Sequence, residues 1–492
     1  MLIAIYLIIQ GIIFLWLFIS TTRRARFLYW AAFLIPLNSV SLEWLSLWTW
    51  AKLVFLIGAI GWVLHAHRWV LRGRGRAPRR ADLRVGVFGL GHFRLFLAYS
   101  LLLTIGWMFY DYAVGLRFSS AESLGWGVAQ STMRYPVQLF SFFTQWGLVL
   151  IGIWFTKAPG DLAAAIRGFV HGNLVNAVTG LYQIGAISLG LPWLRGHWIL
   201  RTPAFNPSVT AEAGAFLGGM TIPRLSGLGG EPKHAGANFV VALFLLLIIS
   251  TFQRREHFGI KNVSLVTAVL FLALILTFSL GSWVAFSVAV SYIVLASLFS
   301  RRIQIVRSLL VLTVIGVLLL VVVGTDLLSV ARDHYVRPRL SEKTVSKYTD
   351  SKVLALFGEN PLSLVIGRGA GGGDFLLLDS ISAGGHPVSS AYTFTRFLPE
   401  AGVVGLLMVL LLAVRWSRFL FKTHLLAHGH FILGGFIVAM ASHVVFLYGF
   451  LLLCGGIVAR GNAAGFSHAR SAPLLRDEIP RCRVSTKNEN RL

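Results

Sequence analysis

Two segments of this chain combine glycines with charged side chains in a way that suits an anionic ligand. The first, residues 223–234, contains Arg224, a run of glycines, and then Glu231, Lys233 and His234. Arginine can bind an anion through bidentate hydrogen bonds, and a carboxylate or imidazole can accept a proton from an incoming hydroxyl. A polar interfacial turn whose arginine and lysine reach lipid headgroups explains the same residues equally well.

The second segment, residues 358–375, is rich in glycine and contains Arg368. It lacks the Gly-Lys-Ser/Thr of a Walker A loop, so we do not expect it to bind a nucleotide in that way. Glycine amides and one guanidinium can still hold a phosphate oxygen, and a plain loop is the alternative.

Polar residues also gather where this long segment ends, at His386, Tyr392, Arg396 and Glu400. Arg396 and Glu400 are four residues apart, so on a helix they share a face and form either a structural or a catalytic pair. Neither large polar segment has the Asp-x-Asp spacing of metal-dependent transferases, so we expect no metal and no cofactor.

The composition predicts an all-α polytopic membrane protein. Of 492 residues, 56% are hydrophobic and only 13% are charged, and the mean hydropathy is +0.73. The net charge of +25 arises largely from arginines in short loops, which predicts membrane orientation and not nucleic-acid binding. Two cysteines without neighbouring ligands indicate neither a disulfide framework nor a zinc site.

Apolar runs predict about twelve transmembrane helices, at roughly 20 residues per span. We expect helices in residues 1–324 with an outer loop at about 191–237, a large periplasmic loop at 325–399, C-terminal helices at 400–458, and a basic, disordered tail at 459–492. The runs are Leu2–Ile19, Leu28–Val40, Ala51–His65, Leu95–Tyr110, Leu139–Phe155, Ala163–Leu189, Ala237–Phe252, Val263–Phe278, Ser282–Phe299, Leu309–Gly324, Ala401–Val414 and Phe431–Leu453.

Five basic loops fall on one side when these helices alternate, and the positive-inside rule makes that side the cytoplasm. The polar segments 111–138, 191–237 and 325–399 are then outside. The basic tail disagrees, because an even number of spans puts it outside as well. Either residues 431–458 form a broken double pass, or the count of the early helices is wrong by one.

A stripe of polar residues and one glycine runs along the sixth apolar run, at Arg167, His171, Asn173, Asn176, Gly180 and Gln183. Polar groups in a membrane helix face the interior of a bundle or a cavity, so this stripe predicts either a transport pathway or contacts between helices.

The order of motifs resembles that of the O-antigen ligase/polymerase family of bacterial envelope glycosyltransferases. The resemblance covers roughly the middle and C-terminal two-thirds of the chain. It rests on the Arg224 to Glu231-Pro232 segment, the Thr277–Ser282 junction, residues 350–361, Ile366–Gly369 and Glu400–Gly405.

This resemblance implies a metal-independent, inverting glycosyltransferase that uses an undecaprenyl-pyrophosphate-linked glycan at the periplasmic face of the inner membrane. Glu231 or His234 would act as the base, beside Arg224. The pyrophosphate or the glycan would be bound by Arg368, Lys352, Arg396, Lys233, His386 and Tyr392.

Three departures from the family pattern favour a polymerase of repeat units over a ligase that uses lipid A core. Leu280 and Lys352 stand where many members have arginine, and Ala391 stands where ligases carry histidine. A transporter or flippase of the same lipid is the alternative from another class. Expected partners are the lipid-linked oligosaccharide, membrane lipids and a chain-length regulator.

The orientation is tested by cysteine labelling. Ser346→Cys should react with an impermeant thiol reagent in cells with a permeabilised outer membrane, whereas Arg76→Cys should be protected because it faces the cytoplasm. The opposite pattern would invert the topology.

Overall fold

The computed structural model describes residues 2–37, 50–71, 90–114, 134–189, 215–217, 220–222, 224–228, 232–252, 258–299, 361–370, 393–442 and 446–471. These residues are almost entirely helical, as the sequence predicted. One short antiparallel ribbon pairs β1 (Ala215–Leu217) with β2 (Met220–Ile222).

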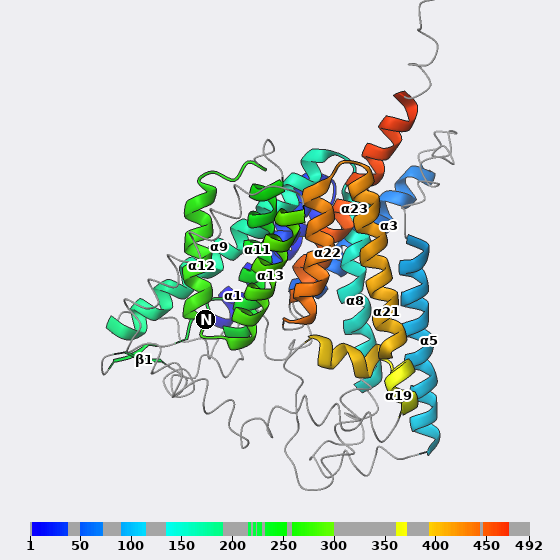
Figure 1. Ribbon diagram of the computed structural model, residues 1–492, viewed down its shortest axis with the longest axis horizontal. Coiled ribbons are helices and arrows are strands. Elements are labelled where there is room, and N and C mark those ends of the chain that lie inside the picture. Colours follow the sequence, from blue (N-terminus) through cyan, green and yellow to red (C-terminus); the bar gives the residue numbers. More distant parts are fainter. Residues whose placement is uncertain are drawn as a thin grey trace, which may run out of the picture.

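The helices alternate in direction and lie side by side, as Figure 1 shows. They are joined by tight turns such as Thr21–Arg23, Thr277–Ser279 and Thr423–Leu425. Their bounds are α1 Leu2–Ser20, α2 Arg24–Leu34 with the 3-10 turn Ile35–Leu37, α3 Trp50–Leu71, α5 Leu90–Val114, α8 Arg134–Phe155, α9 Pro159–Leu189, α11 Pro232–Phe252, α12 Val263–Leu276, α13 Leu280–Phe299, α19 Pro361–Ile366, α21 Thr393–Lys422, α22 Leu426–Met440 and α23 Phe446–Ser471.

Within the described ranges, five helical segments are long and apolar enough to cross a membrane: Leu90–Tyr110, Tyr135–Phe155, Pro232–Phe252, Gly281–Phe299 and Phe397–Lys422. Shorter apolar helices accompany them, including Trp50–His65 and Leu447–Ala463. This supports a membrane protein. The count of about twelve spans stays a prediction, since the run 309–324 and most of the loop 325–399 lie outside the described residues.

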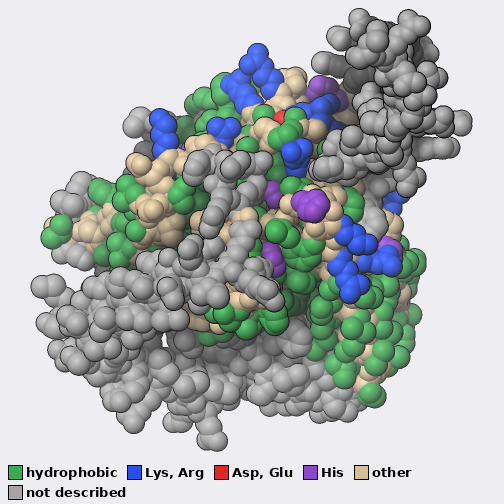
Figure 2. All heavy atoms as spheres, turned by 45° about the horizontal axis from the view of Figure 1, so that its top comes forward, with side chains coloured by type: hydrophobic (Ala, Val, Ile, Leu, Met, Phe, Trp, Pro, Cys, Tyr) green, Lys and Arg blue, Asp and Glu red, His purple; other side chains and the backbone are tan. Residues whose placement is uncertain are grey.

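Basic residues gather at one end of the molecule, which we call the basic end and define by Arg24, Lys157, Lys261 and Arg415. Figure 2 shows Lys and Arg side chains on this end, which is turned forward. Contacts between helices link these regions. The ring of Phe27 lies 4.3 Å from that of Phe155, the ring of Phe258 lies 6.3 Å from that of His428, and Arg415 contacts His92.

The last apolar run forms two helices, α22 and α23, which are separated after Ala441–Ser442. Gly461 in α23 packs against Phe419 and Leu420 near the end of α21, so α23 runs back to the basic end (Figure 1). The two helices agree with the first explanation, a broken double pass, and the count of the early helices stays a prediction.

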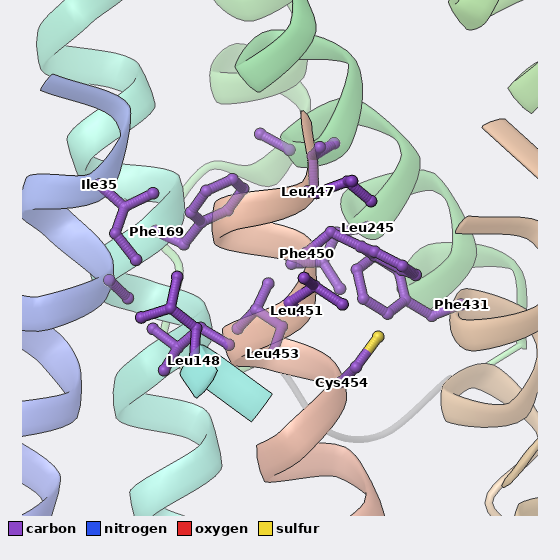
Figure 3. Close-up of a cluster of buried hydrophobic side chains, with 14 of the residues drawn as sticks. Ile35, Leu148, Phe169, Leu245, Phe431, Leu447, Phe450, Leu451, Leu453 and Cys454 are labelled. Carbon is purple, nitrogen blue, oxygen red and sulfur yellow. The ribbon is translucent and has the colours of Figure 1, made fainter. Parts of the chain in front are cut away.

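The core surrounds α11, which is buried on nearly all sides. Figure 3 shows Phe169, Leu245, Phe431 and Phe450, from four helices, in a cluster of buried side chains around the neighbouring helix α23. The rings of Phe431 and Phe450 lie 5.4 Å apart. Because lipid tails are as apolar as these side chains, close packing and not exclusion from water holds the helices together.

Helices α8 and α23 approach closely through glycines. A Cβ atom on Gly152 would lie 2.3 Å from the carbonyl oxygen of Leu452, and one on Gly455 would lie 2.1 Å from that of Val149. Backbone atoms cannot move aside as a flexible side chain can, so both positions require glycine.

We predict that Gly152→Ala lowers the thermal stability of the detergent-solubilised protein, at a cost of about 1–3 kcal/mol, because overpacking pushes the two helices apart. Gly106→Ala in α5 is the matched control, since no atom lies within 4 Å of a Cβ placed there. Alanine favours a helix over glycine, so the control should match or exceed the wild-type stability. Equal effects at the two sites would contradict the packing described above.

Candidate functional site

Arg224 binds the turn between α12 and α13. Its Nε donates to the carbonyl oxygen of Thr277 at 3.1 Å, and its Nη2 donates to that of Phe278 at 3.2 Å. The backbone N–H of Leu225 donates to the carbonyl of Leu276 at 2.8 Å. The last carbonyls of a helix lack partners within it, so Arg224 caps α12 from another segment.

The loop that follows Arg224 is held by polar side chains of α9. Gln183 Oε1 accepts hydrogen bonds from Ser226 Oγ and from the N–H of Gly227, both at 3.1 Å. Asn176 Oδ1 accepts one from the N–H of Leu228 at 2.6 Å. Part of the polar stripe predicted along this helix is therefore used to anchor a loop.

Two other members of that stripe also have partners inside the bundle. Asn173 Nδ2 donates to the carbonyl of Phe169 at 2.9 Å, and the ring of His171 makes a hydrogen bond of 3.0 Å with the hydroxyl of Tyr29. The Asn173 bond stays within α9, whereas the His171–Tyr29 bond joins α9 to α2. The second contact favours a role in joining helices over a transport pathway.

The first turn of α11 lies against the same α12–α13 turn. A Cβ on Gly236 would lie 2.4 Å from Ser282 Oγ and 3.3 Å from Thr277 Oγ1. Ser282 Oγ donates to Ser279 Oγ at 3.0 Å. Lys233 is exposed and His234 half-exposed at the start of this helix. We call this group the Arg224 cluster: Arg224, Ser226, Lys233, His234, Asn176, Gln183, Thr277, Ser279 and Ser282.

The hydroxyls of this cluster were not among the predicted site residues. Thr277–Ser282 carried only the resemblance to a family, and nothing in its spacing placed it beside Arg224. Asn238, one turn into α11, is also buried in this region, and its Oδ1 has no hydrogen-bond partner among the described residues.

Arg368 lies in a second group, between α5 and α21. The N–H groups of Arg368 and Gly369 donate to the carbonyls of Pro399 and Glu400, both at 2.8 Å. Trp107 Nε1 donates to the carbonyl of Gly367 at 3.0 Å. These hydrogen bonds hold residues 367–369 against α5 and against a break in α21.

That break is at Gly402, whose φ of 67° and ψ of −177° are not helical. A Cβ there would lie 2.4 Å from the carbonyl oxygen of Val365, and one on Gly367 would lie 2.6 Å from the nitrogen of Gly402. Tyr99 in α5 closes the contact, because its hydroxyl donates to the carbonyl of Ile366 at 2.6 Å and to that of Ala401 at 3.2 Å.

The guanidinium of Arg368 is held in place from two sides. Its Nε donates to Ser363 Oγ at 3.2 Å, and its Cζ lies 4.9 Å from the centre of the Trp107 ring, at cation–π distance. The side chain is half-exposed. We call this group the Arg368 cluster: Tyr99, Thr104, Trp107, Ser363, Gly367, Arg368, Gly369 and Gly402.

Both clusters lie at the end opposite the basic end, on different helices (Figure 1). The structure brings Arg224, Lys233 and His234 into one region and Arg368 into another. Arg396 lies on α21, in the same helical stretch as Glu400. Glu231, Lys352, His386 and Tyr392 lie outside the described residues.

No group of three or more potential metal ligands occurs among the described residues. Comparison with known proteins adds no relationship: no protein-family model matches this chain, and no curated protein matches it. A function is therefore inferred from the order of the sequence motifs and from the contacts of the two clusters.

We predict that Arg224→Lys lowers the unfolding temperature, although it keeps the charge, because one amine cannot bridge the carbonyls of Thr277 and Phe278 as a guanidinium does. Each lost hydrogen bond from a charged donor costs about 1.5–3 kcal/mol. Lys261→Gln, at an exposed position of the basic end, is the control and should unfold near the wild-type temperature. If both variants unfold like wild type, Arg224 does not cap α12.

Proposed function

We propose that this protein is a membrane glycosyltransferase that polymerises undecaprenyl-pyrophosphate-linked oligosaccharide repeat units into O-antigen or exopolysaccharide. The observation that carries this proposal is the pairing of motifs. Residues 224–228 contact the Thr277–Ser282 junction, and residues 367–369 contact the start of Glu400–Gly405. Four of the segments on which the family resemblance rests are therefore distant in sequence and meet in space as two separate pairs.

The chemistry needs few protein groups. A glycosyl pyrophosphate already carries a good leaving group, so the enzyme must neutralise charge that develops on the pyrophosphate and remove a proton from the acceptor hydroxyl. Arg368 is positioned as a fixed, half-exposed cation, with Lys352 and Arg396 as further candidates. His234 or Glu231 is the candidate base, and direct displacement inverts the anomeric centre.

Arg224 has a supporting part in this proposal. Its guanidinium bonds the carbonyls of Thr277 and Phe278, which sets the turn that carries Ser279 and faces the start of α11. In this proposal Arg224 affects glycan transfer by positioning Ser279 and the start of α11, whether or not it also contacts the pyrophosphate.

The orientation proposed for the enzyme follows from charge. With the basic end in the cytoplasm, by the positive-inside rule, both clusters face the periplasm and the chain resides in the inner membrane. Lipid-linked repeat units would reach the clusters from the outer leaflet. A chain-length regulator is a further proposed partner.

The same chemistry with lipid A core as acceptor would make the protein a ligase. Ala391, where ligases carry histidine, and the departures at Leu280 and Lys352 favour the polymerase. A flippase is disfavoured because Asn176 and Gln183 anchor the loop after Arg224, and His171 bonds Tyr29 of α2.

The double variant Glu231→Gln/His234→Gln tests the proposal. It keeps hydrogen-bonding capacity at both positions and removes both candidate bases, so transfer should fall by about 100- to 10,000-fold. Single repeat units on undecaprenyl pyrophosphate should then accumulate on the outer face of the membrane. His424→Gln, an exposed histidine at the basic end, is the control and should elongate normally.

The assay must report on which face the lipid accumulates. A transporter would strand the same lipid on the cytoplasmic face. Wild-type elongation by the purified double variant would remove both residues from catalysis.

A further inference from the structure

The outward face of α21 changes from apolar to basic toward the basic end. Leu407, Leu410 and Leu411 are 54%, 48% and 59% exposed, and Arg415, Arg418 and Lys422 are exposed further along the helix. At 100° per residue, these six positions share one face of the helix. The opposite face is buried, with Leu412, Trp416 and Leu420 in the core.

A second helix borders this face. The guanidinium of Arg415 contacts the ring of His92 at the start of α5, and both side chains are exposed. Arg415 and a ring N–H of His92 can both donate hydrogen bonds to an anion beside them. Figure 2 shows a group of Lys and Arg side chains directly beside an apolar surface on this end of the molecule.

Acidic residues do not neutralise this surface within the described part of the chain. The acidic residues there are Asp111, Asp161 and Glu400. Asp161 accepts hydrogen bonds from the N–H groups of Lys157 and Ala158 at the start of α9. Asp111 is near the far end of α5, and Glu400 lies beside the Arg368 cluster at the opposite end.

We propose that this face of α21, together with His92, binds an acidic phospholipid from the leaflet at the basic end. The phosphate lies among Arg415, Arg418, Lys422 and His92, and an acyl chain lies along Leu407 and Leu411. A soluble acidic partner would match the charges but would leave the leucines uncovered, whereas a lipid matches both. Clusters of Lys and Arg beside membrane helices bind anionic headgroups in this way. The inference is independent of the proposed function.

The test uses the full-length protein purified in a neutral detergent and delipidated. Native mass spectrometry measures the binding of phosphatidylglycerol and of phosphatidylcholine with identical acyl chains. The wild type should prefer phosphatidylglycerol. The triple variant Arg415→Gln/Arg418→Gln/Lys422→Gln should lose that preference. Each cation contributes roughly a fivefold change in affinity, so the three together change it on the order of 100-fold.

The matched control is Arg24→Gln/Lys157→Gln/Lys261→Gln, which removes the same charge from three exposed positions at the same end on other turns. It should retain the preference, and the charge-preserving Arg415→Lys/Arg418→Lys should also keep most of it. Thermal unfolding of each variant verifies that it is folded.

Two results would overturn the proposal. One is an equal loss of binding in the two triple variants, which would indicate general surface charge. The other is full competition by glycerol phosphate at the concentration of the lipid, which would show that the apolar half of the surface contributes nothing. Phosphatidylcholine affinity should be the same in the wild type and both triple variants.

Discussion

The structure depends on how backbone polar groups are satisfied where apolar helices break. In a membrane, an unpaired N–H or C=O has no water to bond, so irregular backbone persists only where protein groups or an aqueous cavity provide partners. The chain breaks in this way at the α12–α13 turn and at Gly402 in α21. Arg224 supplies the partners at the first break, and residues 367–369 with Tyr99 supply them at the second.

This constraint explains why the polar residues of greatest interest gather at one end. At each break in a helix, backbone carbonyls need hydrogen-bond donors from another segment of the chain. The segments that supply these donors also contain charged or hydroxyl side chains. Arg368 belongs to the loop whose N–H groups bond the carbonyls of Pro399 and Glu400. Ser282 lies beside Gly236, next to the α12–α13 turn that Arg224 binds. The same residues can therefore support the fold and present groups to a substrate, which is typical of irregular membrane segments that line functional sites.

Much of the architecture could be predicted from hydropathy and charge. Within the run 431–453, residues 431–440 belong to α22 and residues 446–453 belong to α23, which agrees with a broken double pass. The regions of Arg24 and Arg415 lie at the same end of the molecule. Local pattern is sufficient for these features, because a span is a property of about 20 consecutive residues. The count of spans and the long loop depend on residues outside the described ranges.

The site was harder to predict because its contacts are not local. Arg224 reads as an anion-binding residue in sequence, whereas its partners Thr277 and Phe278 are about fifty positions away. From the sequence, Asn176 and Gln183 indicate either a pathway or contacts between helices, and in the structure they anchor a loop that follows them by more than forty positions. Nothing in the sequence pairs Gly367 with Gly402, although each makes room for the other's backbone. A single sequence carries no signal of such pairings.

The central claim is that this chain alone joins lipid-linked repeat units. The direct test uses purified wild-type protein in proteoliposomes. These are supplied with undecaprenyl-pyrophosphate-linked repeat units and EDTA but no nucleotide, and the lengths of the products are measured. The claim predicts products of two or more repeats on a single lipid, together with release of free undecaprenyl pyrophosphate. Movement of unextended lipid between leaflets, with no elongation and no released pyrophosphate lipid, would contradict it.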